Sequence, residues 1–372
     1  MFKASLAKYR LIGKLPDPFL LENGKRVASP AAWAQRKKEL MRLAVDFQYG
    51  GLPPAPEFVS VEPLYEGARL SSYRILTGTY ERPISFSMQV VFPPEKKDVY
   101  PAVIDGDACF DYMYKEAFLQ PFQDIGAIFV RFNRTELAAD VRKEHTEGLY
   151  GVYPGLRFTG LAAWAWGYHR CVDALEKLGI ADKRYIVFTG HSRGAKTALL
   201  AGATDERATI VNPNAGCSGA GACYRVHSSM LCEDGEVRPS STLEKMALFP
   251  DWFTPELLSY AGREQELPLD CHFLKALIAP RILLMTEAMS DAWANPAGVS
   301  VTNRAAAEVY RFQKEEDKLL LHYRDGFHAH APEDARILAN VIAHAAWGLP
   351  LDASIGQDPF SDLPKAYDWI CP

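Results

Sequence analysis

The fold is decided by the stretch Tyr185-Ile186-Val187-Phe188-Thr189-Gly190-His191-Ser192-Arg193-Gly194-Ala195-Lys196-Thr197-Ala198-Leu199-Leu200. It opens with an apolar run of the length of a buried strand and closes with an Ala/Leu-rich helical run. Between them, residues 190–194 read G-x-S-x-G, and the order strand, tight turn, helix is what a nucleophile elbow requires. The pattern predicts Ser192 in a strained conformation at the carboxyl end of a sheet, beside a helix N-terminus that favours negative charge. The alternative is an ordinary strand-to-helix connection whose glycines are only steric.

Segments typical of strands and helices alternate along the rest of the chain. Apolar or alternating runs predict strands at residues 72–80, 84–92, 100–105, 126–132, 207–211, 282–286 and 319–323. Amphipathic runs predict helices that start at Pro30 after a Ser29 cap and that span residues 161–178 and 334–347. This alternation indicates a mostly parallel sheet that helices cover on both faces.

The chain is interpreted as one domain over residues 1–372, because it shows no internal repeat and no linker of low-complexity composition. Residues 1–60 are expected to wrap around this domain, and residues 227–270 form a long insertion near the active site. Residues 133–160 lack a periodic pattern, and their tyrosines and glycines indicate a structured loop that walls a cleft.

Composition excludes several classes of function. The 372 residues are 48% hydrophobic and 23% charged, which suits a globular protein with a sizeable core. A net charge of −5 argues against a broad basic surface for nucleic acid. No run approaches the roughly 18 apolar residues of a membrane span. Residues 1–10 lack the apolar segment of a signal peptide, so a cytoplasmic location is expected.

The cysteines point to neither a disulfide framework nor a metal site. There are seven, an odd number, scattered without a C-x-x-C pair, at positions 109, 171, 217, 223, 232, 271 and 371. In a chain without a secretion signal we interpret them as reduced and mostly buried thiols. No metal and no other cofactor is expected.

A serine nucleophile needs a base to take its proton and a third group to orient that base. In a sheet of this kind the expected chain order is Ser, then acid, then His. Asp291 lies just beyond the predicted strand at residues 282–286, and His328 follows the one at residues 319–323. The sequence therefore predicts the triad Ser192, Asp291 and His328.

Two of these positions have rivals. His330 is two residues from His328 and could be the base instead. Glu287 sits nearer the strand end than Asp291 and is the rival acid. His191, beside the serine, is expected to pack against the site or to support it from behind.

Two positive charges follow the serine. Arg193 could stabilise an oxyanion or grip a carboxylate, and Lys196 lies one helical turn from Ser192 on the same face. Together they suggest a substrate with an acidic group near the scissile ester, and the alternative is two solvated helix charges. The segment Asp105-Gly106-Asp107 is either a plain turn or the source of an N–H group for the oxyanion hole.

These residues resemble the glucuronoyl esterases, carbohydrate esterase family 15. The elbow, Gly190-His191-Ser192-Arg193 with Lys196, is similar to the family pattern G-[CH]-S-R-x-x-K. Further segments are also similar to the family. Gly216–Arg225 ends A-C-Y-R where the family segment ends S-A-C-W-R. Residues 267–272 and 277–281 match L-P-x-D-x-H and L-I-A-P-R, and residues 291–296 match the bacterial D-x-W-A-x-P. The resemblance extends from about residue 15 to residue 350.

The resemblance implies an α/β-hydrolase fold, a three-layer sandwich with a mostly parallel central sheet flanked by helices. It also implies hydrolysis of 4-O-methyl-glucuronic acid esters, as found between xylan and lignin alcohols. Residue by residue it implies the following roles: nucleophile Ser192, base His328, acid Asp291, oxyanion stabiliser Arg193, and sugar contacts Lys196 and Trp293. The expected partner is a small-molecule or oligosaccharide uronate ester.

The sequence departs from the family pattern in two places. Many members carry a glutamate after the strand that follows the elbow. The aligned position in this chain is near Ala215, which cannot serve as the acid, and this leaves the acid role to Asp291. His191 stands where secreted fungal members have a disulfide cysteine. Two other functions stay open: an acetyl or acyl esterase acting on xylan side groups or small metabolites, and an inactive carbohydrate-binding pseudo-hydrolase.

Overall fold

A large mixed sheet runs through the centre of the molecule. The computed structural model describes residues 5–140 and 146–372, so the start of the predicted wrapping segment and part of the predicted loop at 133–160 lie outside the described residues. Within these ranges the sheet has nine strands, in the order β12 (Leu319–Arg324), β11 (Ile282–Ala288), β8 (Ile210–Asn214), β7 (Ala181–His191), β5 (Tyr100–Asp105), β6 (Ile128–Phe132), β4 (Pro83–Val91), β3 (Leu70–Gly78) and β2 (Phe58–Glu66). Every neighbouring pair from β12 to β6 is parallel, and β4, β3 and β2 are antiparallel.

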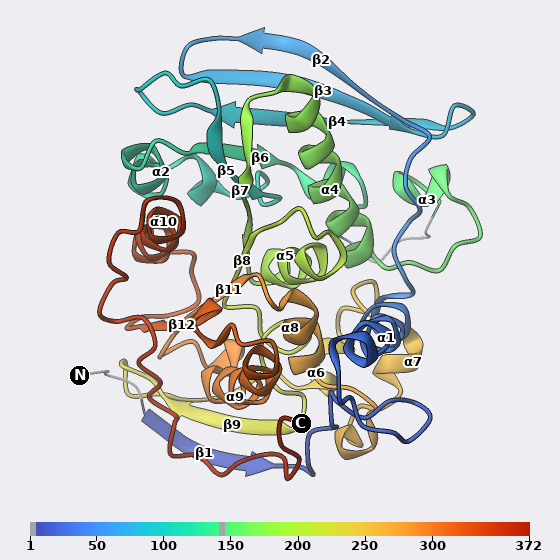
Figure 1. Cartoon of the computed structure of the whole chain (residues 1–372), viewed down its shortest axis with the longest axis vertical. Coiled ribbons are helices and arrows are strands. Elements are labelled where there is room, and N and C mark those ends of the chain that lie inside the picture. The colour runs from blue at the N-terminus through green and yellow to red at the C-terminus, as the bar shows by residue number, and fades with distance from the viewer. Residues whose placement is uncertain (1–4, 141–145) are drawn as a thin grey trace.

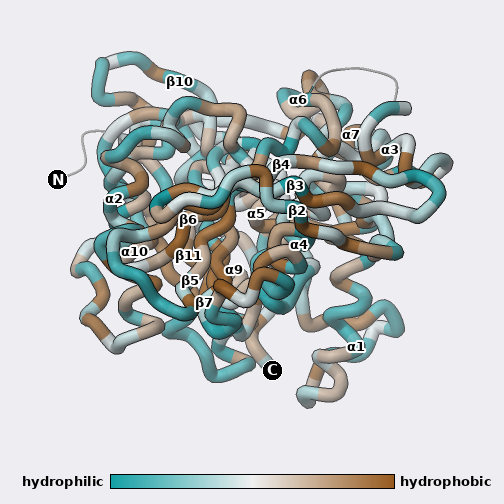
Figure 2. Tube along the Cα trace, turned by 90° about the horizontal axis from the view of Figure 1, so that it is seen from above, coloured by the Kyte–Doolittle hydropathy of each residue, from teal (hydrophilic) through white to brown (hydrophobic). Residues whose placement is uncertain are grey.

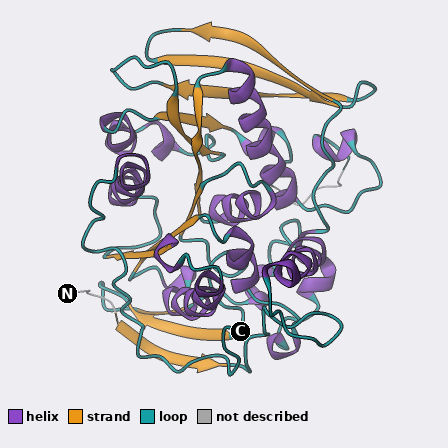
Figure 3. Ribbon diagram, viewed as in Figure 1, coloured by secondary structure: helices purple, strands orange, loops and turns teal. Residues whose placement is uncertain are grey.

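Helices cover both faces of this sheet, which gives the three layers of an α/β-hydrolase fold (Figures 1 and 3). On one face lie α2 (Glu116–Asp124) and α10 (Pro332–Trp347), which contact each other. On the other lie α4 (Gly160–Leu178), α5 (Arg193–Thr204), α8 (His272–Ile278) and α9 (Pro296–Phe312), and α1 (Pro30–Met41) packs on α8. Among the described residues, no helix combines the length and apolar character needed to cross a bilayer.

The central parts of the parallel strands are mostly apolar because both faces of the sheet are covered. Every residue of β5 and of β6 is buried. A contiguous apolar cluster includes residues from near both ends of the chain, from Leu15 to Trp369, and the single-domain interpretation stays a prediction. The buried thiols that the sequence predicts are those of Cys171, Cys217, Cys223, Cys232 and Cys271.

Most predicted elements are present, with shifted ends. The predicted hairpin is β3 and β4, and α1 begins at Pro30 with the Ser29 hydroxyl accepting the Ala32 N–H at 3.2 Å. The strand expected at residues 207–211 lies slightly later in the chain, at β8. Several helices were not predicted, among them α2, which carries an internal Pro121, α8, which is only seven residues long, and α9, which consists largely of small residues.

A second, smaller sheet joins two parts of the chain that the sequence analysis treated separately. It consists of β1 (Ser5–Leu11), β9 (Val226–Leu231) and β10 (Val237–Pro239), all antiparallel. The wrapping segment thus contributes a strand that was not predicted, and the insertion at 227–270 begins inside a strand. The rest of the insertion holds α6 (Leu243–Met246) and α7 (Pro255–Leu258), and α3 (Leu149–Val152) lies in the loop before α4.

A buried ion pair ties the start of β9 to the segment before α8. Arg225 is 1% exposed and donates to Asp270, which is fully buried, at 2.8 Å. The same guanidinium donates to the carbonyl oxygens of Leu269 and Leu267, and Asp270 also accepts the Tyr224 N–H at 3.1 Å. These contacts join two of the motifs that carried the family resemblance.

Replacing Asp270 with alanine leaves the Arg225 charge buried without its carboxylate. We therefore expect Asp270→Ala to lower the free energy of unfolding by about 3–5 kcal/mol, measured by urea denaturation at pH 7. Asp368→Ala is the matched control, because its carboxylate pairs with Lys14 at the exposed surface. Equal stability of the two variants would contradict a structural role for the buried pair.

Candidate active site

The elbow has the strained geometry that the sequence predicts. Ser192 stands between the end of β7 and the start of α5 with a φ of 57°, a left-handed conformation that is rare for residues with a side chain. A Cβ at position 190 would lie 2.6 Å from the Gly194 carbonyl oxygen, so Gly190 is needed there. The Ser192 N–H donates to the Asn214 carbonyl oxygen at 3.0 Å, which fixes the turn to β8.

The predicted base and acid are hydrogen-bonded to each other. Nδ1 of His328 lies 2.6 Å from Oδ2 of Asp291. The Asp291 side chain is 2% exposed and also accepts the Ala294 N–H at 3.1 Å, which fixes its orientation. A proton on Nδ1 in this bond leaves Nε2 of His328 as the basic nitrogen.

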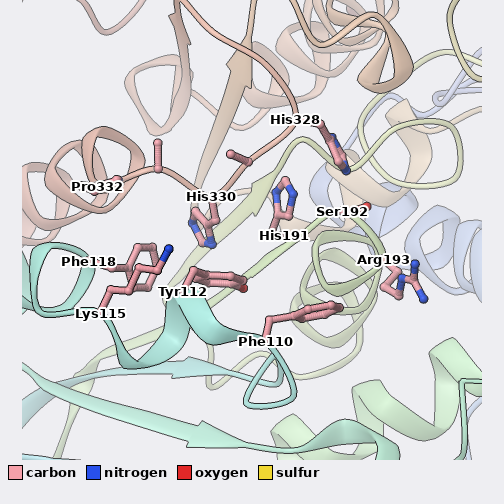
Figure 4. Close-up of a pocket in the computed structure, with 12 residues that line it drawn as sticks. Phe110, Tyr112, Lys115, Phe118, His191, Ser192, Arg193, His328, His330 and Pro332 are labelled. Carbon is pink, nitrogen blue, oxygen red and sulfur yellow. The ribbon is translucent and has the colours of Figure 1, made fainter.

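Ser192 and His328 line the same cavity, which has a volume of about 540 Å³. Figure 4 shows the imidazole of His328 turned toward the serine hydroxyl, with the Arg193 side chain also at the rim of the cavity. The structure thus brings Ser192, Asp291, His328 and Arg193 together. Six more of the lining residues are Phe110, Tyr112, Lys115, Phe118, His330 and Pro332.

The rival acid and the rival base occupy different positions. Glu287 is fully buried, and neither carboxylate oxygen has a hydrogen-bond partner. Burial, and then the charge of Asp291, raises the pKa of Glu287 well above its ordinary value, with Lys275 opposing. His330 is buried against Phe118 with both ring nitrogens unbonded. Neither residue makes the His–carboxylate contact that His328 and Asp291 make.

His191 supports the site from behind the serine, as expected. Its Nδ1 lies 2.7 Å from Oδ1 of Asn214, and its ring centre is 4.4 Å from that of His328. Burial, and then the proximity of His328, lowers the pKa of His191 to about 3. The ring is therefore neutral at physiological pH and adds no charge beside the base.

The segment Asp105-Gly106-Asp107 acts through a carboxylate more than through its N–H groups. The N–H groups of residues 106, 107 and 108 donate to Tyr168 Oη, Asp105 Oδ1 and the Phe132 carbonyl oxygen. This arrangement favours the turn interpretation over the oxyanion-hole interpretation. The Asp107 carboxylate accepts the His191 N–H at 2.9 Å and the Tyr112 hydroxyl at 2.7 Å.

Arg134 neutralises Asp107, and the sequence analysis identified neither residue as functional. Both side chains are fully buried and form an ion pair. The guanidinium lies between the rings of Phe110, at 5.4 Å, and Trp164, at 4.8 Å. The sequence signal for Asp107 is the charged Asp-Gly-Asp loop after a buried strand. Arg134 has no such signal, because it lies in a loop with no periodic pattern.

The two cations after the serine converge on one tryptophan. Arg193 donates to Asp140 at 2.5 Å and lies 5.0 Å from the Trp252 ring centre, and Lys196 lies 5.7 Å from the same ring. Trp252 also donates to Asp140 at 3.1 Å. Lys196 is 1% exposed, so the alternative of a solvated charge is wrong for this residue. Its ammonium donates to the Gly216 carbonyl oxygen at 2.5 Å, and burial lowers its pKa.

Trp293 lies in the acid loop, two residues after Asp291. It is partly buried and packs against Ala215, Cys217 and Ala294. The Lys245 ammonium lies 5.5 Å from its ring centre. Neither Trp293 nor Lys196 lines the cavity of Ser192, so their predicted sugar contacts stay predictions.

These features define a class: proteins with the α/β-hydrolase fold, a serine on the elbow, and a His–Asp pair on the loops after β12 and β11. Among the described residues, no group of histidine, cysteine and carboxylate side chains has the arrangement of a metal site. The family model of the fungal glucuronyl esterases matches residues 75–313. The chain belongs to the glucuronoyl esterase family.

Individual relatives agree with this assignment. A 4-O-methyl-glucuronoyl methylesterase of Podospora anserina is 32% identical over 75% of this chain, and the match spans 56% of that relative. One of Hypocrea jecorina is 28% identical over 96% of this chain and 76% of the relative. Among solved structures, a family 15 glucuronoyl esterase of Caldicellulosiruptor kristjansonii has a TM-score of 0.80 at 27% identity, covering 95% of this chain and 97% of that one. The catalytic domain of a glucuronoyl esterase of Hypocrea jecorina has 0.78 at 26%, covering 98% of both chains.

Two isosteric variants distinguish the candidate acids. Asp291→Asn removes the carboxylate that fixes the His328 tautomer, so we expect kcat for ester hydrolysis to fall by about 10³–10⁴-fold. Glu287→Gln preserves a neutral side chain of the same shape, and we expect kcat within about threefold of wild type. The opposite pattern would assign the acid role to Glu287.

Glu287 also predicts a pH dependence of stability. The native state holds its proton at pH values where an unfolded glutamate, with a pKa of about 4.3, has released it. The stability contributed by this proton is complete below about pH 4.3 and is lost as the pH rises toward the native pKa. Glu287→Gln should therefore gain about 1–3 kcal/mol relative to wild type between pH 4.5 and 6.5, measured by urea unfolding. A difference that stays constant over this range would show that Glu287 is ionised in the native state.

Proposed function

We propose that this protein is a serine carboxylic-ester hydrolase that cleaves esters of glucuronic acid, or its 4-O-methyl form, through an acyl-enzyme. The observation that carries the proposal is the 2.6 Å His328–Asp291 hydrogen bond beside Ser192, in a cavity that Arg193 also lines. The relatives named above as 4-O-methyl-glucuronoyl methylesterases support this choice of acyl group.

The reaction follows from these positions. His328 takes the Ser192 proton as Oγ attacks the ester carbon, and the carbonyl oxygen becomes an oxyanion. The first N–H groups of α5 point out of the helix end and, with Arg193, stabilise that charge. His328 then donates the proton to the departing alcohol, which leaves a uronyl ester on Ser192. A water molecule, deprotonated by His328, hydrolyses this ester and restores the serine.

The cations and the tryptophan at the start of α5 favour a uronyl sugar on the acyl side, whose carboxyl group is neutral in the ester and becomes charged in the oxyanion and in the product. Arg193 and Lys196 bring two positive charges to the Trp252 ring, and among the residues that the structure describes only Arg193 has a carboxylate partner, Asp140. An aromatic face beside polar and charged groups is suited to a sugar ring. The sequence departs from the family pattern near Ala215, and this departure fits the arrangement of the cations. Ala215 is buried directly after β8 and has no carboxylate that could pair with them.

The other wall of the cavity favours an apolar alcohol. His328 protonates the leaving group, so the alcohol lies on the His328 side of Ser192. The same cavity is lined by the aromatic rings of Phe110, Tyr112 and Phe118. An aromatic or benzylic alcohol can bury its ring against them. An acetyl ester could use Arg193 at the oxyanion, but it has no sugar ring on the acyl side to place against Trp252.

The assay that tests the proposal compares benzyl glucuronate with p-nitrophenyl acetate. We expect kcat/KM to be higher for the glucuronate, and we expect Ser192→Ala to lose about 10⁴-fold or more in kcat on both substrates. Ser259→Ala, at an exposed hydroxyl on the surface, is the matched control.

A preference for the acetate would keep the hydrolase and reject the uronate. Near wild-type activity of Ser192→Ala would reject the mechanism, and inertness of the wild-type protein on both esters would favour the pseudo-hydrolase. A cytoplasmic location stays a prediction, for which cell fractionation is the measurement.

A further inference from the structure

A second cavity, outside the one that holds Ser192, lies between the small sheet and α6. Its volume is about 520 Å³, close to that of the first cavity. Polar and basic side chains dominate its lining, among them Lys8, Arg10, His227, Ser229, Thr242 and Lys245. None of these residues has a part in the reaction described above.

The strand register directs the basic groups into this cavity. Lys8 of β1 pairs with Ser229 of β9, and Arg10 pairs with His227. Directly paired residues of antiparallel strands present their side chains on the same face, and alternate residues of one strand share that face. Lys8, Arg10 and His227 therefore project together from the small sheet, and Lys245 approaches from α6.

Folding leaves most of this positive charge without an ion-pair partner. Within the described ranges, Lys8, Arg10 and Lys245 form no ion pair. Two carboxylates lie nearby: Glu244 lines the cavity, and Oε1 of Glu264 lies 3.9 Å from Nε2 of His227. The whole chain carries a net charge of −5, so a group of unpaired cations is a local reversal of sign. Lys8 and Arg10 share one face of β1 two residues apart, so their charges repel each other, and an anionic ligand would relieve this repulsion.

The cavity adjoins the loop that carries Asp291. The Lys245 ammonium, which donates to the Ser240 carbonyl oxygen at 2.8 Å, lies 5.5 Å from the ring centre of Trp293. The Ser241 N–H donates to the Trp293 carbonyl oxygen at 3.2 Å. In Figure 2, β10, α6 and α7 lie along one edge of the molecule, and the segment between α6 and α7 carries the Trp252 that contacts Arg193.

We propose that this cavity binds the free carboxylate of a second uronic acid on a saccharide whose esterified uronate occupies the Ser192 site. The proposal rests on the function proposed above and extends it from a single ester to an acidic saccharide. The cations of the cavity match a carboxylate, and the hydroxyls of Ser229 and Thr242 can bond to sugar hydroxyls. Each hydrolysis creates such a carboxylate, so a partly hydrolysed chain gains affinity for this cavity.

Two substrates with the same scissile bond test the proposal. One is benzyl glucuronate, and the other is a xylo-oligosaccharide that carries one benzyl-esterified glucuronate and one free glucuronate. The double variant Lys8→Gln/Arg10→Gln should raise KM for the diacid about tenfold at low salt, with kcat unchanged. Its constants for benzyl glucuronate should stay within twofold of wild type. Lys14→Gln removes an exposed lysine that does not line the cavity and should change neither substrate.

Equal effects of the double variant on both substrates, or no effect on either, would overturn the proposal. If wild type hydrolyses neither ester, the proposed function has failed, and calorimetric binding of trigalacturonate still tests the cavity. We then expect about tenfold weaker binding to the double variant than to wild type or Lys14→Gln. Unchanged binding would reject the cavity, and inorganic phosphate competing as well as trigalacturonate would reject its assignment to saccharides.

Discussion

The positive φ of Ser192 is the constraint on which the site depends. A left-handed conformation at a residue with a Cβ costs about 1–3 kcal/mol, and it persists only if the surroundings enforce it. Here the Asn214 carbonyl oxygen accepts the serine N–H on one side, and the Asp107 carboxylate accepts the His191 N–H on the other. A side chain at position 194 would collide with that same carboxylate. Helix α5 can therefore come this close to Asp107 only because residue 194 is a glycine.

Charge is distributed so that the oxyanion meets positive groups. The Asp107 carboxylate lies close to the start of α5, where a bare negative charge would oppose the developing oxyanion. The buried ion pair with Arg134 removes most of this opposition. Asp140 has a positioning role. It accepts a hydrogen bond from the Arg193 guanidinium and so holds that group against Trp252 and beside the cavity. The carboxylates near the serine therefore arrange the cations as well as the backbone.

Local patterns predicted the parts of the site that follow from one segment at a time. The elbow, the strand before His328 and the loop after β11 were found because each combines an apolar run with a turn. Long-range packing was not predictable: Lys196 is buried because Trp252, from the insertion, covers it. Strand β1 is mostly polar, and its pairing with β9 depends on a partner far along the chain. The unpredicted helix α9 begins with small and polar residues, so no run of large apolar residues marks its start.

The pairing of β1 with β9 has a consequence for folding order. Leu11 pairs with Val226 and Ser5 with Leu231, so β1 has no partner until β9, far along the chain, has been synthesised. Contacts this distant in sequence form slowly, because a long loop must close before they contribute stability. Strands β2 to β8 of the main sheet are synthesised before β9, so they are available to pair with one another before the small sheet can assemble. During that interval β1 is an unpaired edge, and its exposed lysine and arginine are the kind of residues that keep such an edge from pairing with other chains.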